Sequence, residues 1–463
     1  MKGIGRLFSL GIAKETTRGT AKTSASHWLP FADAVLDEKF ENVKQDEAYG
    51  IIEDHVAEFR IKNWVEGTIK VPATSESLPT MLLAMFGVDA DATHSGETTI
   101  YDHTTTVGES AQHQSLTFFL HDPLSGVDYS HALGVIHKMD LDVELKKFVE
   151  LSLSVKALKG VSQSTFSPSI ATENRFLPQY MTFASAPTTA GLVSVFAATG
   201  TAASTVHVTA LSIPTDKIKV GMTVVGTNIP SGVTVATIVS ATAFDLSSAS
   251  TGNASDLTFG SLAASGTASS TTAVTALSIN TNLIKVGMTV TGKYVPAGAT
   301  VAAIVSASSF TLSAATTGAM AAITFGPAVV QLKSFKLIAD ASLEDDDVLG
   351  ATAPIDFLNK EFKMSGTLEA IWQNESDFKT QALATPNAAQ ALLVSIVNTD
   401  VTIGSAANPA IAITLDQVYF TEFSRPIKIK DLVYQTIKFS CSYSTANSEM
   451  ANIVTTNSTA TAV

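Results

Sequence analysis

A strict alternation of apolar and polar residues between positions 140 and 156 constrains the fold of this chain most. Two short alternating runs lie on either side of a pair of lysines. A period of two places apolar side chains on one face of a strand and polar side chains on the other. The pattern therefore predicts an antiparallel hairpin with one apolar face and one polar, mostly acidic face. The apolar face comprises Leu141, Val143, Leu145, Leu151 and Leu153.

The composition favours a β-rich chain of more than one domain. The 463 residues are 45% hydrophobic and only 15% charged, with many small and β-branched side chains. The net charge of -13 argues against sequence-independent binding of nucleic acid through a basic patch. The single cysteine, Cys441, excludes an intramolecular disulfide.

The sequence predicts neither a membrane span nor secretion. No apolar run reaches the length that crosses a bilayer. The apolar stretch within residues 1–13 is short and is interrupted by Ser9 and Gly11, which is untypical of a signal peptide. We therefore expect an intracellularly made protein that is not exported.

A recent internal duplication occupies the middle of the chain. Residues 200–260 match residues 266–326 at a constant offset of 66, with 38 of 61 positions identical. Val220-Gly221-Met222-Thr223-Val224, for example, recurs as Val286-Gly287-Met288-Thr289-Val290. This pattern predicts two tandem immunoglobulin-like β domains rather than a solenoid.

A fainter similarity relates the two flanking regions. Gly67-Thr68-Ile69 corresponds to Gly366-Thr367-Leu368 at an offset of about 300, and residues 148–155 correspond to 432–439 at an offset of 284. Residues 76–86 have helical spacing, with Pro79 near the start and Gly87 at the end, and residues 375–383 match them. We interpret these matches as a divergent duplication.

The predicted fold is mainly β, with two β-barrel or β-sandwich modules that each carry one short helix, and with two small immunoglobulin-like β domains inserted between them. The predicted divisions are an N-terminal arm (1–30), module one (31–187), the repeats (188–262 and 263–327), module two (328–445) and a polar C-terminal tail (446–463).

No enzyme signature is present, and we expect neither a cofactor nor a bound metal. A cluster of possible metal ligands lies in one region, but its spacing matches no zinc motif: His121, Asp122, Asp128, His131 and His137. Cys441 alternates in register with apolar neighbours, which favours a core side chain over a nucleophile. The acidic run Glu344, Asp345, Asp346 and Asp347 is predicted to lie in a loop that faces solvent or a cation.

The flanking regions resemble the major tail tube proteins of long-tailed (siphovirus-type) bacteriophages. The resemblance covers most of 1–187 and 328–445 and rests on several structural motifs. These are residues 10–20, 46–50, 64–67, 173–178 (Glu-Asn-Arg-Phe-Leu-Pro), 347–350, 397–400 and the closing strand pair at 418–443. The 66-residue repeats depart from the family pattern.

The resemblance implies a structural subunit whose rings stack into a hollow tube for DNA passage. Two modules per chain then imply trimeric, pseudo-hexameric rings. Asp140, Asp142, Glu144 and Glu150 are expected to line an acidic lumen. Asp46, Glu47 and Tyr49, together with Glu344, Asp345, Asp346 and Asp347, are the candidates for ring-stacking loops.

The implied partners are further copies of the chain, tape-measure, tail-terminator and tail-tip proteins, and DNA in transit without specific binding. The implied location is the virion tail, after assembly in the bacterial cytoplasm, without membrane insertion.

Two other readings belong to different protein classes. A bacterial surface adhesin with tandem β domains would need an export signal and an anchor. A carbohydrate-active enzyme would need two separated carboxylates in a cleft rich in aromatics, yet aromatic residues are only 7% of this chain.

Overall fold

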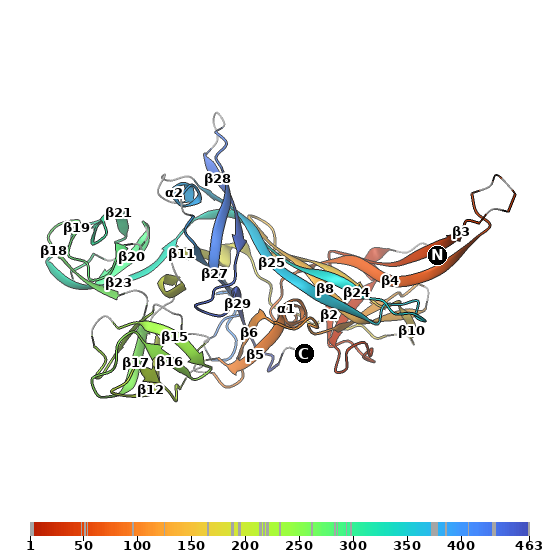
Figure 1. Cartoon of the computed structure of the whole chain (residues 1–463), viewed down its shortest axis with the longest axis horizontal. Helices are drawn as coiled ribbons and strands as arrows, with labels where there is room; N and C mark the ends of the chain where they lie inside the picture. Colours follow the sequence, from red (N-terminus) through yellow and green to blue (C-terminus); the bar gives the residue numbers. More distant parts are fainter. Residues whose placement is uncertain are drawn as a thin grey trace.

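The computed structural model shows a mainly β protein in which a long sheet carries two small β lobes at one end (Figure 1). It describes residues 4–461 except 48, 51, 53, 95–96, 125, 164–165, 187–188, 193–195, 213–214, 216–217, 219–221, 231–232, 261–262, 282–283, 285, 293, 297–298, 372–377, 385–386, 406 and 428–431.

The hairpin predicted at 140–156 is confirmed and belongs to a four-stranded unit, here called the N-terminal half-sheet. Its strands lie in the order β3 (Asp33–Gln45), β4 (Ala57–Pro72), β9 (Glu150–Ala157) and β8 (Asp128–Glu144). Leu141 and Val143 are buried, as are Leu151 and Leu153 on β9. The prediction for Leu145 is wrong: this side chain is 58% exposed because β8 ends at Glu144.

A second unit, the C-terminal half-sheet, has the same strand order. It runs β24 (Leu332–Asp346), β25 (Asp356–Ile371), β28 (Tyr434–Cys441) and β27 (Ala410–Ser424). Gly67 lies opposite Val155 in the first unit, and Gly366 lies opposite Phe439 in the second. Gly67 and Gly366 are related by the offset of about 300, and Val155 and Phe439 by the offset of 284, that the flanking sequences show.

The irregularities of the two half-sheets also correspond. The register of β3 on β4 shifts at Glu41/Asn42, and that of β24 on β25 shifts at Ser342/Leu343. A second pair of shifts lies at Ile136/Lys138 on β8 and at Phe420/Glu422 on β27. Counted from Gly67 in one half and from Gly366 in the other, the two shifts of each pair lie the same number of residues away. Because bulges fix register and twist, the two half-sheets are matched position by position.

One ladder joins the half-sheets into a continuous eight-stranded sheet. β8 pairs antiparallel with β24 from Lys138 opposite Asp340 to Glu144 opposite Ser334. A second link lies outside this sheet, where β6 (Tyr101–Val107) pairs with β29 (Ala451–Asn457). The two halves therefore form one body, and among the described strands neither half closes into the barrel that is one of the predicted forms.

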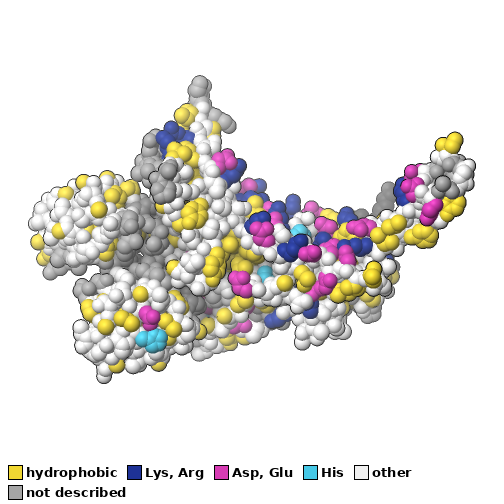
Figure 2. All heavy atoms as spheres, viewed as in Figure 1, with side chains coloured by type: hydrophobic (Ala, Val, Ile, Leu, Met, Phe, Trp, Pro, Cys, Tyr) yellow, Lys and Arg dark blue, Asp and Glu magenta, His cyan; other side chains and the backbone are white. Residues whose placement is uncertain are grey.

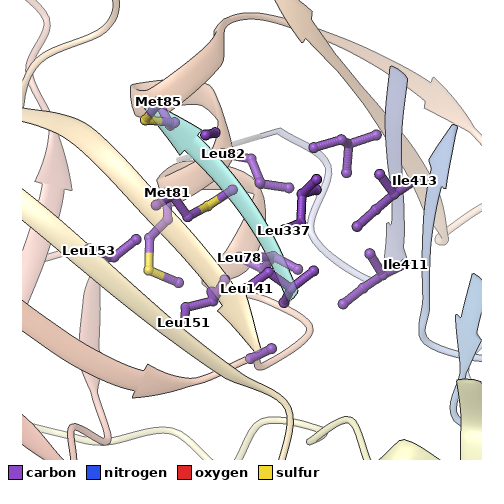
Figure 3. Close-up of a cluster of buried hydrophobic side chains, with 14 of the residues drawn as sticks. Leu78, Met81, Leu82, Met85, Leu141, Leu151, Leu153, Leu337, Ile411 and Ile413 are labelled. Atoms are coloured by element: carbon purple, nitrogen blue, oxygen red, sulfur yellow. The ribbon is translucent and has the colours of Figure 1, made fainter. Parts of the chain in front are cut away.

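The apolar face of the sheet covers one large core (Figure 3). Helix α1 (Leu78–Phe86) directs Leu78, Met81 and Met85 toward side chains of both half-sheets. The helix ends as predicted, with Pro79 in its first turn and Gly87 in the left-handed region at φ 93°. Glu173, the first residue of the Glu-Asn-Arg-Phe-Leu-Pro motif, accepts hydrogen bonds from the backbone N–H groups of Glu76 and Ser77 and so caps the helix.

The second predicted helix is shorter than expected. α2 (Phe378–Ala382) packs beside β27, and residues 375–377 of the predicted helix lie outside the described residues.

Both chain ends form strands rather than a loose arm and tail. β1 (Ser9–Lys14) pairs with β2 (His27–Leu29) and β7 (Leu116–His121), and buries Leu10 and Ile12. In the expected C-terminal tail, β29 pairs with β27 and β6, and most of its residues are buried. The remaining strands of the body are β5 (Gly87–Thr93), β10 (Val161–Gln163), β11 (Met181–Ala186) and β26 (Gln390–Val397).

Each 66-residue repeat forms one small lobe from six described strands. The first contains β12 (Phe196–Ala203), β17 (Asn253–Gly260) and β14 (Thr223–Gly226), with β13 (His207–Val208), β16 (Ala243–Leu246) and β15 (Val235–Ser240). The second contains β18 (Ala263–Ser269), β23 (Ala319–Val329) and β20 (Met288–Gly292), with β19 (Ala273–Val274), β22 (Ser309–Leu312) and β21 (Val301–Ser306).

The lobes have matching pairings and separate cores. Val208 lies opposite Phe244 in the first, and Val274 lies opposite Phe310 in the second. Val220 and Gly221 of the repeat motif lie outside the described residues. Six strands are one fewer than the immunoglobulin constant type has.

Candidate assembly surface

Charged side chains gather on the concave face of the long sheet (Figure 2). The four acids predicted to share a face do so: Asp140 and Asp142 are half-buried, and Glu144 and Glu150 are exposed. They alternate with buried apolar residues such as Leu141, so they lie on the side away from the core.

A lysine that the sequence did not single out lies between two of these acids. Lys336 on β24 is 2.8 Å from Asp140 and 3.6 Å from Asp142. Burial lowers the pKa of Lys336, but the hydrogen bonds and charges of the two carboxylates outweigh this and raise it. The sequence gives no sign that Lys336 faces these acids, because their proximity depends on the pairing of β8 with β24.

The whole face carries both signs of charge with acids in excess. By strand register, its acids include Asp33, Asp37, Glu66, Asp140, Asp142, Glu144, Glu150, Asp340, Glu361, Glu369 and Glu422. Its lysines include Lys39, Lys70, Lys138, Lys156, Lys336, Lys363 and Lys438.

The acidic run 344–347 lies at the end of a strand rather than in a loop. Glu344, Asp345 and Asp346 belong to β24, and Asp347 follows them. Asp345 bridges the half-sheets, at 2.8 Å from Lys62 on β4 and 2.9 Å from Lys156 on β9. Burial raises the pKa of Asp345, but the two lysines outweigh it and hold the pKa below its usual value.

The other members of this run also have lysine partners. Asp347 lies 2.6 Å from Lys62, and Glu344 lies 3.1 Å from Lys360. Lysine ammonium groups of the chain itself therefore pair with Glu344, Asp345 and Asp347.

The second set of predicted stacking residues lies at the end of the long β3–β4 hairpin. Asp46, Glu47 and Tyr49 are exposed there. The hairpin projects from the body (Figure 1) and carries apolar side chains that are about half exposed. They are Phe40, Val43, Phe59 and Ile61. An apolar surface on a projecting hairpin is typical of a contact with another protein.

Two edges of the eight-stranded sheet are open among the described strands. β3 pairs with β4 on one side only. β27 pairs with β28 along residues 418–424, whereas β26 and β29 flank the earlier part of β27 on opposite sides, so one side of residues 419–424 has no partner among the described strands. Such edges offer backbone groups to a further strand.

A groove of 740 Å³ lies next to β25, at the border of the two halves. Glu361, Phe362 and Tyr443 line it from the C-terminal half, and Glu109 and Ser110 line it from the other side.

One ionic cluster around a buried histidine lies away from these surfaces. His103 on β6 contacts Asp91 at 2.5 Å and Asn457 at 2.9 Å through its two ring nitrogens. Burial lowers the pKa of His103, but hydrogen bonds with Asp89, Asn457 and Asp91 outweigh it and raise the pKa to about 9. Asp89, Asp91 and His103 could converge on a metal ion, but both nitrogens of His103 already have partners, which favours an imidazolium ion pair.

The histidines predicted to crowd one region are only partly together. His121 lies 2.9 Å from Asp128, whereas His131 faces the carbonyl of Leu158. Burial lowers the pKa values of His131 and His137, and raises the pKa of Cys441 to about 12. These groups are poor candidates for acid–base or nucleophilic chemistry.

No protein-family model matches the chain, and no curated protein matches its sequence. Among the described residues, none of the helices has the length and apolar character needed to span a membrane.

Proposed function

We propose that this chain is the repeating subunit of a hollow tube through which DNA passes. The observation that carries the proposal is the ladder of β8 with β24. It joins two half-sheets of equal strand order, and leaves at the ends of the sheet a first strand, β3, and a last strand, β27. β3 is the counterpart of β24, and β27 is the counterpart of β8. The β27 edge of one copy can therefore pair with the β3 edge of the next as β8 pairs with β24 within the chain.

Three copies make the ring that suits two modules per chain. Eight strands from each of three chains give a barrel of 24 strands. With about 4.8 Å between strands and a tilt of about 40°, such a barrel measures about 50 Å across and leaves a bore of about 40 Å. That bore admits a DNA duplex, whereas eight strands closed within one chain would fill their interior with side chains.

The charge of the concave face suits this use. If the apolar face packs on the core, the face with Asp140, Asp142, Glu144 and Glu150 looks into the bore. Excess negative charge repels phosphates, and the interspersed lysines limit the self-repulsion of the wall.

The remaining surfaces have roles in the same assembly. The two repeat lobes lie at one end of the chain, away from the β3–β4 hairpin (Figure 1), and project outside the tube. The exposed hairpin end with Asp46, Glu47 and Tyr49 contacts other copies. The resemblance noted above adds the tape-measure, terminator and tip proteins as partners, and the virion tail as the location.

Electron microscopy of the purified protein tests the proposal. We expect rings or hollow filaments in negative stain, with three chains per ring by mass measurement. Six chains per ring would contradict the trimer, and a monomer at all concentrations would contradict the tube. A monomer that binds glycans through its lobes would favour the adhesin.

A further inference from the structure

The contact between the two halves of one chain provides a template for a contact between two chains. The end of the β24–β25 hairpin crosses onto the N-terminal half-sheet. There Leu343 and Phe357 pack with residues that include Trp64. Lys62 holds Asp345 at 2.8 Å, and the backbone N–H of Asn63 donates to the carbonyl of Thr352 at 2.7 Å.

The matched registers translate each member of this contact to the other half. Counted from the equivalent glycine positions, Asp345 on β24 corresponds to Lys44 on β3. In the same way, Lys62 on β4 corresponds to Glu361 on β25. Within the chain, the acid Asp345 is on the hairpin and Lys62 is on the sheet. In the corresponding pair, Lys44 is on the hairpin and the acid Glu361 is on the sheet. Complementarity survives because both signs change together.

The same exchange occurs along the ladder itself. Lys138 lies opposite Asp340 where β8 meets β24. The corresponding residues are Glu422 on β27 and Lys39 on β3. Two independent positions therefore keep an opposite-charge pair with its polarity reversed.

The place that Thr352 takes in one half is an open groove in the other. The counterpart of Asn63 is Phe362, which lines the 740 Å³ groove. The segment that corresponds to Thr352 is the end of the β3–β4 hairpin, where Tyr49 and Ile52 are 50% and 101% exposed. One half has the filled site, and the other has the groove and the free hairpin.

We infer that the end of the β3–β4 hairpin of a second copy occupies this groove, with Lys44 on Glu361 and Lys39 opposite Glu422. The inference rests on the proposed function and specifies its ring contact. Within the single chain, these four residues pair with exposed local partners, and docking would exchange those contacts for ones between chains. The local partners are Asp37 for Lys39, Asp54 for Lys44, Lys363 for Glu361 and Lys438 for Glu422.

Charge reversal tests the assignment. Lys44→Glu and Glu361→Lys should each raise the protein concentration needed for assembly about tenfold or more, because each places like charges together. The double variant should restore assembly to near the unmodified level. Lys70→Glu, an exposed residue of β4 outside the contact, is the matched control. Circular dichroism of each variant checks that the monomer is folded.

A cysteine pair tests the register. Lys39→Cys with Glu422→Cys should yield chains linked by a disulfide under mild oxidation. Asp33→Cys with Glu422→Cys should not, because Asp33 lies about 20 Å further along β3. Cys441 offers little competing thiolate, since burial raises its pKa to about 12. Equal cross-linking of the two pairs would contradict the proposed register.

The outcomes separate this inference from the proposed function. If rings form equally well with Lys44→Glu, or if the double variant does not restore assembly, the proposed contact is wrong. Either result would leave the proposed tube intact. An unmodified protein that never assembles would overturn the tube itself.

Discussion

Gly67 and Gly366 fill the same position in the two half-sheets. A Cβ atom on Gly67 would collide with the carbonyl oxygen of Val35, and one on Gly366 would collide with that of Lys336. Val35 and Lys336 are themselves counterparts on β3 and β24. The close approach of two strands at this point is therefore a shared feature of the fold, and glycine is required by space rather than by backbone angle.

Alanine at either glycine should destabilise the protein. We expect Gly67→Ala to cost about 3 kcal/mol, since the nearest atoms belong to backbone that cannot move aside. Gly366→Ala should cost a similar amount, because its Cβ would also meet the ring of Phe439. Chemical denaturation measures both, with Gly5→Ala as control because no atom lies within 4 Å of its added Cβ. Unchanged midpoints would contradict the close approach.

The buried His103 makes stability depend on pH. Its pKa is about 9 in the folded protein and about 6.5 in the unfolded chain. A raised pKa means that the stabilisation is complete below pH 6.5 and is lost as pH rises through 9. The contribution is of the order of 3 kcal/mol. Melting temperatures from about pH 6 to about pH 10 should fall for the unmodified protein and lose this slope in His103→Gln. An equal slope in both proteins would assign the effect to other groups.

The clamp of Arg18 on Asp356 ties the first segment of the chain to β25. Arg18 contacts the carboxylate at 2.7 Å and donates to the carbonyls of His113 and Phe357. Lysine cannot reproduce these forked contacts, so Arg18→Lys should cost about 2 kcal/mol and Arg18→Ala about 3 kcal/mol. Urea denaturation measures whether the loss of unfolding free energy is larger for Arg18→Ala than for Arg18→Lys. The control is Lys22→Ala, which loses an exposed hydrogen bond and should cost under about 1 kcal/mol.

Alternation and offset predict structure only where a residue's neighbours in sequence indicate its environment. The hairpin of β8 and β9 and the lobe strands follow from such local patterns. β29 does not, because Thr456 and Asn457 belong to a stretch that resembles a polar tail. They are buried because partners far along the chain satisfy them, such as Asp102 for Thr456 and His103 for Asn457. The sequence places Asp345 in a loop for the same reason: its lysines lie on other strands.

The candidate contact could not be predicted from the sequence alone, because the charges at its aligned positions are reversed between the two halves. Lys62 with Asp345 and Glu361 with Lys44 correspond at the offsets between the flanking regions. Neither pair is visible until the strand registers are known, because the charges differ at each aligned position.

Removal of the repeat lobes should leave a folded body. The body meets the second lobe mainly through small side chains, including Ala184, Ala186 and Ala391. Deleting 190–326 keeps the residues of β23 that pair with Ala184 and Ser185. We expect a melting temperature within a few degrees of the full chain, and assembly at the same concentration. Loss of assembly with a folded monomer would make the lobes part of the tube wall.

Reversing charge on the concave face should make tubes retain DNA. Glu150 is exposed beside Asp142 on this face, whereas Asp245 lies on the first lobe. In Glu150→Lys, each ring of three gains six units of positive charge inside the bore, and Asp245→Lys gains the same charge outside it. Duplex DNA should co-sediment with Glu150→Lys tubes at low salt and be released as salt rises, because counterion release drives phosphate binding. Nuclease should degrade DNA bound by Asp245→Lys tubes and spare DNA held by Glu150→Lys tubes. Equal nuclease sensitivity in the two variants would place Glu150 outside the bore.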